Sequence, residues 1–167
     1  MTRAEVDRQW RVRVGVDVAL PVSAAWAWRR MQHLAWFATL DPFHERIHLR
    51  EKPARPGTPL AIEHRYAGMG LTRVGRVLQW REGESYSFSD LSRRGRQAGF
   101  PHVYVYTVQP RGEAACCVSV TVRGRWTLRV LPRWLVRAWL WWVMMQTGQR
   151  IRHALLAEAV AGEWRIK

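Results

Sequence analysis

Asp90, His64 and His102 are the residues whose types suit acid–base chemistry. A carboxylate beside a histidine takes up and releases protons near neutral pH, which an aldol-type cyclisation or a dehydration requires. The three residues belong to separate segments, and no motif fixes their geometry. They are catalytic candidates only if the fold brings their segments together, so whether the chain is an enzyme stays open.

Alternating tyrosines accompany these histidines and predict a pocket for a small molecule. In residues 60–66 and 100–108 the tyrosines and histidines share one face of a strand, because side chains alternate between faces. Small-molecule pockets are mainly aromatic with a few orienting polar groups, and Tyr supplies both. The alternative is that one of these faces is the exposed side of the sheet. With five residues near the C-terminus, the expected ligand-binding set is His64, Tyr66, Tyr86, His102, Tyr104, Tyr106, Trp139, Trp142, Gln146, Gln149 and His153.

Metal and phosphate chemistry is not expected from the spacing of residues. The two cysteines are neighbours and are not spaced with the six histidines as a zinc site requires. His44 and His48 have the spacing of a helical metal pair, but they lie in a loop-to-strand stretch where that spacing does not bring them together. The segment from Gly68 to Gly70 lacks the Lys and Ser/Thr of a phosphate loop. We therefore expect no metal and no cofactor.

The N-terminal third predicts a strand followed by two helices. Residues 10–20 alternate strictly between apolar and polar, which is typical of a half-buried strand. Ser23 is a suitable N-cap for a helix over residues 24–34. A second helical turn over residues 35–40 must end before Pro42, because the residue preceding a proline is pushed out of helical geometry.

The middle of the chain predicts six strands joined by short turns. Segments rich in β-branched and aromatic residues recur there at regular spacing, which indicates one antiparallel meander. The expected strands are residues 46–51, 60–66, 71–81, 85–91, 100–109 and 113–122.

A long helix over about residues 133–161 is expected to close the chain, because no proline interrupts this stretch. Three polar residues of this helix, Gln146, Gln149 and His153, are expected on its sheet-facing side. They indicate either a cavity that holds polar ligand atoms or a solvated edge. Gly148 weakens the helix by about 1 kcal/mol relative to Ala. The stripe expected to face the sheet is Leu135, Ala138, Trp139, Trp142, Gln146, Gln149, His153, Leu156, Ala157 and Val160.

The first half of this helix is apolar nearly all round and must bury a second face. Trp134 and Trp141 lie off the sheet-facing stripe, with Arg133 and Arg137 beside them. The first helices, a homodimer partner or an anionic membrane surface are the three covers that this pattern allows. The apolar run itself is about a dozen residues, whereas a membrane-spanning helix needs about 20.

The composition indicates one folded domain of 167 residues. A hydrophobic fraction of 48% excludes a disordered chain. The net charge of +14 comes from arginines scattered along the whole chain, so a nucleic-acid partner is not expected. Glu5 and Asp7 and the lack of an apolar stretch before Val12 are unlike a secretory signal, and adjacent cysteines fit a reducing compartment, so we expect a cytoplasmic protein.

This order of elements resembles the START-like helix-grip fold, also called the SRPBCC superfamily. The resemblance covers nearly the whole chain and depends on diffuse features. Its carriers are VDVALPVSAAWAW (Val16 to Trp28), the aromatic segment Trp36 to Pro42, LTRVGRVLQWREGESYSFSD (Leu71 to Asp90) and the terminal helix. It implies an α+β fold in which a curved antiparallel sheet of about seven strands grips the terminal helix, in the order β, α, α, six β, α.

The resemblance also implies a ligand cavity between sheet and terminal helix. The superfamily includes lipid-transfer domains, plant pathogenesis-related proteins, and polyketide cyclases and aromatases, so it implies no single reaction. The first hypothesis is binding or transport of a hydrophobic small molecule, lipid-like or polycyclic. The alternatives are a cyclase- or aromatase-like enzyme and a protein peripheral to the membrane that attaches through its Trp/Arg helix.

Overall fold

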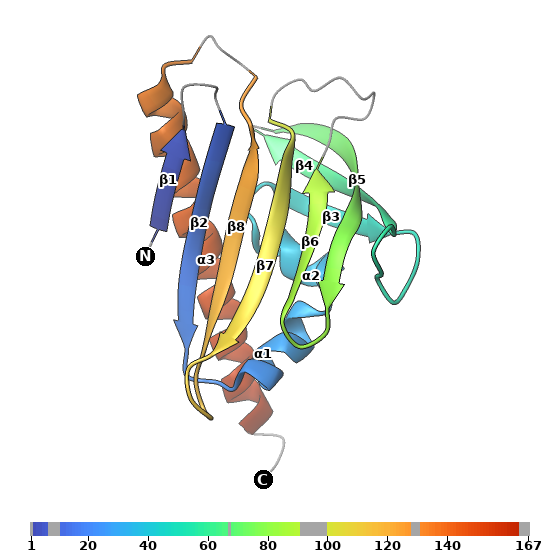
Figure 1. The fold of residues 1–167 in the computed structure, drawn as a ribbon, viewed down its shortest axis with the longest axis vertical. Helices are drawn as coiled ribbons and strands as arrows, with labels where there is room; N and C mark the ends of the chain where they lie inside the picture. The colour runs from blue at the N-terminus through green and yellow to red at the C-terminus, as the bar shows by residue number, and fades with distance from the viewer. Residues whose placement is uncertain (1, 7–10, 67, 91–99, 128–130, 164–167) are drawn as a thin grey trace.

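The computed structural model describes residues 2–6, 11–66, 68–90, 100–127 and 131–163. Figure 1 shows the strands in one sheet with the helices on one side of it. The elements are β1 (Thr2–Val6), β2 (Arg11–Leu20), α1 (Ala24–Met31), α2 (Leu34–Phe37), the 3-10 turn η1 (Ala38–Leu40), β3 (His44–Leu49), β4 (Pro59–Tyr66), β5 (Met69–Arg81), β6 (Ser85–Asp90), β7 (His102–Pro110), β8 (Cys116–Arg125) and α3 (Arg133–Glu163).

Over the described residues the sheet has eight strands in the order β1-β2-β8-β7-β6-β5-β4-β3, and the pairs of neighbours are antiparallel. Strands β3 to β8 form the expected meander, and β2 joins its end by pairing with β8. β1 adds an edge strand that the sequence pattern did not predict. Register shifts between β3 and β4 and between β5 and β6 mark two irregularities in the half of the sheet opposite β1. Such bulges bend the strands that carry them.

The N-terminal elements follow their local sequence signals closely. Val12, Val14, Val16, Val18 and Leu20 of β2 are buried in strict alternation with half-buried or exposed residues. The Ser23 hydroxyl accepts a hydrogen bond from the backbone N–H of Trp26 at 3.2 Å, which caps α1 as predicted. α1 ends at Met31, three residues before the expected boundary.

The terminal helix lies over one edge of the sheet rather than over its middle. α3 packs against β2 and β1, and Figure 1 shows it running behind β1, β2 and β8. α1 and α2 cover the face formed by β6 and β7, where Phe37 contacts the ring of Tyr106 at 5.7 Å between ring centroids. Within the described residues no helix is long and apolar enough to cross a membrane.

The expected sheet-facing stripe of α3 is wrong in its rotation about the helix axis. The buried positions are Val136, Leu140, Val143, Met144, Thr147, Gly148, Ile151 and Leu155. These positions lie one residue along from several of the expected ones, and one residue is about 100° of helix rotation. The pattern misled because the first half of α3 is apolar on every side, so hydrophobicity alone gives it no direction.

Candidate functional site

Five neighbouring strands bring a group of polar side chains into the interior at one end of the sheet. Strand register accounts for the meeting, because His44 pairs with His64 across β3–β4 and Asp90 pairs with His102 across β6–β7. Every member of the group is buried. This Asp90 cluster consists of Asp41, His44, His64, Arg73, Asp90, His102 and Tyr104.

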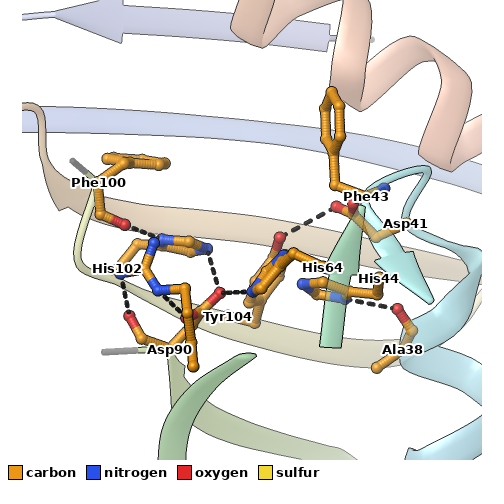
Figure 2. A network of polar contacts seen from close by, with 10 residues as sticks. Ala38, Asp41, Phe43, His44, His64, Asp90, Phe100, His102 and Tyr104 are labelled. Atoms are coloured by element: carbon orange, nitrogen blue, oxygen red, sulfur yellow. Dashed lines mark hydrogen bonds and ion pairs between the residues drawn. The ribbon is translucent and has the colours of Figure 1, made fainter. Parts of the chain in front are cut away.

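The Asp90 carboxylate is the centre of the cluster (Figure 2). Its Oδ2 lies 2.9 Å from His64 Nε2 and 3.4 Å from His102 Nε2. Its Oδ1 lies 2.6 Å from Arg73 Nε. The fold thus brings the three acid–base candidates of the sequence together and adds a guanidinium that the sequence analysis missed.

Burial and charge fix the protonation of this centre. Burial alone would raise the pKa of Asp90, but the hydrogen bond from His64 and the charges of His102, His64 and Arg73 hold it below its ordinary value. Burial lowers the pKa of His102 from 6.5 to about 4, although the Asp90 charge opposes that shift. At neutral pH the centre therefore combines an ionised carboxylate with a neutral His102, an arrangement suited to accepting a proton or a cation.

Two histidines of the cluster are oriented by backbone carbonyls. His44 Nδ1 lies 2.8 Å from the Ala38 carbonyl oxygen, and His102 Nδ1 contacts the Phe100 carbonyl oxygen. A carbonyl only accepts hydrogen bonds, so each Nδ1 is the donor. The Nε2 atoms of these two rings are therefore unprotonated when the rings are neutral.

Asp41 and His44 are two further members that the sequence analysis did not select. The Asp41 carboxylate accepts hydrogen bonds from the Tyr104 hydroxyl at 3.0 Å and from the Phe43 backbone N–H at 2.9 Å. His48 instead lies exposed, with Nε2 2.8 Å from Glu63 Oε1. His44 and His48 therefore do not form a metal-binding pair, as expected from the sequence. Asp41 directly follows the predicted helical turn over residues 35–40, and nothing in the local sequence indicated that its side chain would be buried.

A pocket of about 1050 Å³ lies at another part of the molecule, between α1, α2, the β3–β4 loop and the β5–β6 turn. Its described lining includes none of the expected ligand-binding residues. The lining residues are Arg29, Arg30, Gln32, His33, Leu34, Ala35, Trp36, Leu49, Lys52, Pro53, Ala54, Arg55, Trp80, Glu82 and Glu158.

One wall of this pocket is built around Glu82. The indole N–H groups of Trp28 and Trp80 donate to its two carboxylate oxygens at 2.7 and 2.9 Å. The bonds from Trp80 and Trp28 lower the pKa of Glu82, so it is ionised at neutral pH. Across the pocket, Arg30 Nε lies 2.8 Å from Glu158 Oε2 and links α1 to α3.

Comparison with solved structures identifies the fold. No protein-family model and no curated protein sequence matches the chain. A START superfamily protein from Mycobacterium smegmatis is 14% identical with a TM-score of 0.69, over 87% of this chain and 97% of that one. The Zhui aromatase/cyclase from Streptomyces is 14% identical with a TM-score of 0.68, over 94% and 96% of the two chains. The chain has the START-like helix-grip fold.

A plant enzyme shares this helix-grip fold as well. Norcoclaurine synthase from Thalictrum flavum is 11% identical with a TM-score of 0.61, over 95% of this chain and 98% of that one. The fold class expected from the sequence is thereby confirmed, with one strand more than expected.

The tyrosines expected to line a helix-grip cavity pack against other aromatic rings. The rings of Tyr86 and Tyr106 stack with centroids 5.1 Å apart, and both side chains are buried. Burial raises the pKa of both hydroxyls well above the ordinary value. Tyr104 stacks on Phe88 at 5.1 Å and donates to the Asp41 carboxylate. The side chain of Tyr66 lies outside the described residues.

The expected ligand-binding residues of α3 are also displaced from the sheet. Gln149, His153 and Trp142 are exposed, and Gln146 is half-buried. Trp139 is half-buried and packs on Phe43 with ring centroids 5.5 Å apart. The expectation that these side chains face the sheet is therefore wrong for the three exposed ones, and the cause is the rotation of α3 described above.

Proposed function

We propose that this protein binds a small hydrophobic molecule with a ring in the pocket between α1, α2, the β3–β4 loop and the β5–β6 turn. The pocket volume of about 1050 Å³ carries the proposal, since sites for drug-sized ligands are typically about 300–1,000 Å³. Trp36 and Trp80, with Leu34 and Leu49, give its lining apolar and aromatic surface. One neighbour of the same fold, a norcoclaurine synthase, is described in complex with dopamine and hydroxybenzaldehyde, and both are single-ring molecules.

The rim of the pocket favours a ligand that also carries an acidic group. Arg29, Lys52 and Arg55 are exposed at the rim. Arg30 is paired with Glu158, so the remaining fixed anion of the lining is Glu82. The surplus of cations attracts an anionic group at the mouth, while the apolar lining takes the ring.

The position of the pocket supports binding more strongly than a cyclase-like reaction. The acid–base groups Asp90, His64 and His102 are not part of its described lining. A molecule in this pocket therefore contacts tryptophans and rim charges rather than the acid–base centre. Catalysis at the Asp90 cluster would require a separate route into the interior, and no observation favours one.

Two fluorescent probes that differ only in charge test the proposal. N-phenyl-1-naphthylamine is neutral, and 1-anilinonaphthalene-8-sulfonate is the same ring system with an acidic group. We expect both to bind, the sulfonate more tightly. Replacing Trp36 by Ala should weaken both about tenfold, because it removes about 1–1.5 kcal/mol of aromatic contact. Trp134→Ala, which removes a tryptophan that does not line the pocket, is the matched control.

The two parts of the proposal fail in different ways. If neither probe binds, or if Trp36→Ala and Trp134→Ala bind the neutral probe equally, the pocket is not the binding site. If the double variant Lys52→Glu/Arg55→Glu binds the sulfonate as tightly as the wild type does, the preference for an acidic group is wrong while the hydrophobic site stands. The double variant Arg111→Glu/Arg123→Glu, at exposed positions outside the described lining of the pocket, controls for the change in net charge.

A further inference from the structure

Two of the three imidazoles around Asp90 have the outer hydrogen bond that histidines of metal sites make. His44 and His102 each donate through Nδ1 to a backbone carbonyl, that of Ala38 and that of Phe100. Metal-ligating histidines almost always make this outer hydrogen bond, because it fixes the tautomer and directs the Nε2 lone pair inward. The backbone thus orients two lone pairs towards the interior of the cluster.

These lone pairs face atoms that cannot donate to them. His44 Nε2 is fully buried and has no hydrogen-bond partner among the residues that the structure describes. His102 Nε2 faces Asp90 Oδ2 at 3.4 Å, and both atoms are acceptors when the ring is neutral. Two acceptors at this distance repel each other unless a positive charge lies between them.

The distances suit a single small cation. Two ligands that bind one zinc ion at about 2.0–2.2 Å lie about 3–3.5 Å from each other. His64 Nε2 and Asp90 Oδ2 are 2.9 Å apart, and His102 Nε2 is 3.4 Å from the same oxygen. The ligating atoms of His44, His64 and Asp90 all lie within 4.8 Å of one another, so a movement of His44 by about 1 Å would complete the set.

The charges of the cluster leave a place for a cation. Asp41 and Asp90 are both buried, and among the described residues Arg73 is the buried guanidinium that pairs with Asp90. Arg73 occupies Asp90 Oδ1, which leaves Oδ2 turned towards the histidines. A divalent ion there would offset the surplus negative charge and the mutual repulsion of the lone pairs.

We propose that His44, His64 and Asp90 bind a divalent transition metal, with His102 as a fourth ligand. The ion takes the place of the Nε2 proton that His64 otherwise donates to Asp90 Oδ2, and the neutral His64 ring then carries its proton on Nδ1. A set of three imidazoles and one carboxylate suits zinc, cobalt, iron or nickel better than calcium or magnesium, which prefer oxygen ligands. Four protein ligands leave no open position, so the ion has a structural role. It ties together β3, β4, β6 and β7, which contribute one ligand each. This inference is independent of the ligand-binding pocket.

Cobalt titration of the untagged full chain tests the site. After treatment with a chelator, we expect the wild-type protein to bind one equivalent of Co²⁺ with the visible absorption of a four-coordinate ion, and Zn²⁺ to displace it. Zn²⁺ should also raise the melting temperature of the chelator-treated protein, because it binds the folded state alone. His44→Ala should abolish the cobalt spectrum.

His48→Ala is the matched control, because His48 lies on the same strand but is exposed. It should keep the cobalt spectrum unchanged. Circular dichroism shows whether His44→Ala is folded, and His102→Gln provides a second variant that should weaken Co²⁺ binding at least tenfold. The proposal is overturned if the chelator-treated wild type shows neither the spectrum nor the thermal shift, or if folded His44→Ala binds Co²⁺ as the wild type does.

Discussion

Arg73 is the buried cation that faces Asp90 from the neighbouring strand, with Nε 2.6 Å from Oδ1. Replacing Arg73 by Met keeps the length of the side chain but leaves Asp90 without that partner. Removing one member of a buried ion pair costs about 3–5 kcal/mol of unfolding free energy. Urea denaturation followed by circular dichroism measures the loss.

Arg76→Met, on the exposed side of the same strand, is the control and should change the free energy of unfolding by less than about 0.5 kcal/mol. Equal stability of the two variants would show that the pair contributes nothing.

Glu82 makes a prediction that depends on pH. Its pKa is lowered from 4.5 by the hydrogen bonds from Trp80 and Trp28. A carboxyl group with a lowered pKa stabilises the folded state above its unfolded pKa and loses this contribution as the pH falls through the folded pKa. Glu82→Gln should therefore unfold at lower urea than the wild type at pH 7, with the difference shrinking below about pH 4.

Glu84→Gln is the control for this effect, because Glu84 lies in the same turn and is exposed. It should behave as the wild type at both pH values. A difference between Glu82→Gln and the wild type that stays constant from pH 7 to pH 3 would contradict the role of the ionised carboxylate.

The chemistry of single residues was partly predictable from the sequence. Asp90, His64 and His102 were selected by type, and strand register then brought them together. Arg73 was missed because an arginine on a strand is taken as solvent-facing until its neighbours are known, and His44 was missed because it was considered only as a metal pair with His48. Their burial depends on how neighbouring strands pair in the sheet, which the pattern of a single segment does not record.

At the scale of elements, the position of α3 along the chain was predictable and its rotation was not. The helix begins at Arg133 as expected and ends within two residues of the expected boundary. Its buried side includes Thr147 and Gly148, whereas Trp142 is 47% exposed. At Gly148 the helix approaches β2 closely, and a hydrophobicity pattern does not record this contact.

Gly148 tests this account of helix packing. Ala is better than Gly in a helix by about 1 kcal/mol, but a Cβ on Gly148 would lie 2.7 Å from Val16 Cγ2. Overpacking of this kind typically costs about 1–3 kcal/mol. We expect Gly148→Ala to destabilise the protein in urea denaturation and Val16→Ala to relieve that loss in the double variant.

Gln149→Ala, at the adjacent exposed position, should leave stability unchanged or slightly raised and so controls for helix propensity. If Gly148→Ala stabilises the protein alone, or if its effect is the same with and without Val16→Ala, the close contact does not determine the rotation of α3.

At the scale of the whole molecule, the first half of α3 leaves an aromatic and basic surface uncovered by the described residues. Trp134 is 71% exposed and Trp141 48% exposed. With Arg133 and Arg137, also exposed, they form what we call the Trp/Arg face of α3. The positions 134, 137 and 141 have the spacing of one helix side. Tryptophan favours the interface of a bilayer and arginine pairs with anionic lipid, so this face and the net charge of +14 suit an anionic membrane surface.

We therefore expect the protein to sediment with phosphatidylserine-containing vesicles but not with pure phosphatidylcholine vesicles. Binding should weaken as salt rises, because screening reduces the attraction between arginines and lipid. Trp134→Ala/Trp141→Ala should lose most of the binding, while Trp36→Ala, which alters the small-molecule pocket, should retain it. Equal sedimentation of the double variant and the wild type would exclude the Trp/Arg face as the contact. A stable dimer in analytical ultracentrifugation that the double variant dissociates would assign the face to a second copy of the chain instead, because its tryptophans would then be covered by protein rather than by lipid.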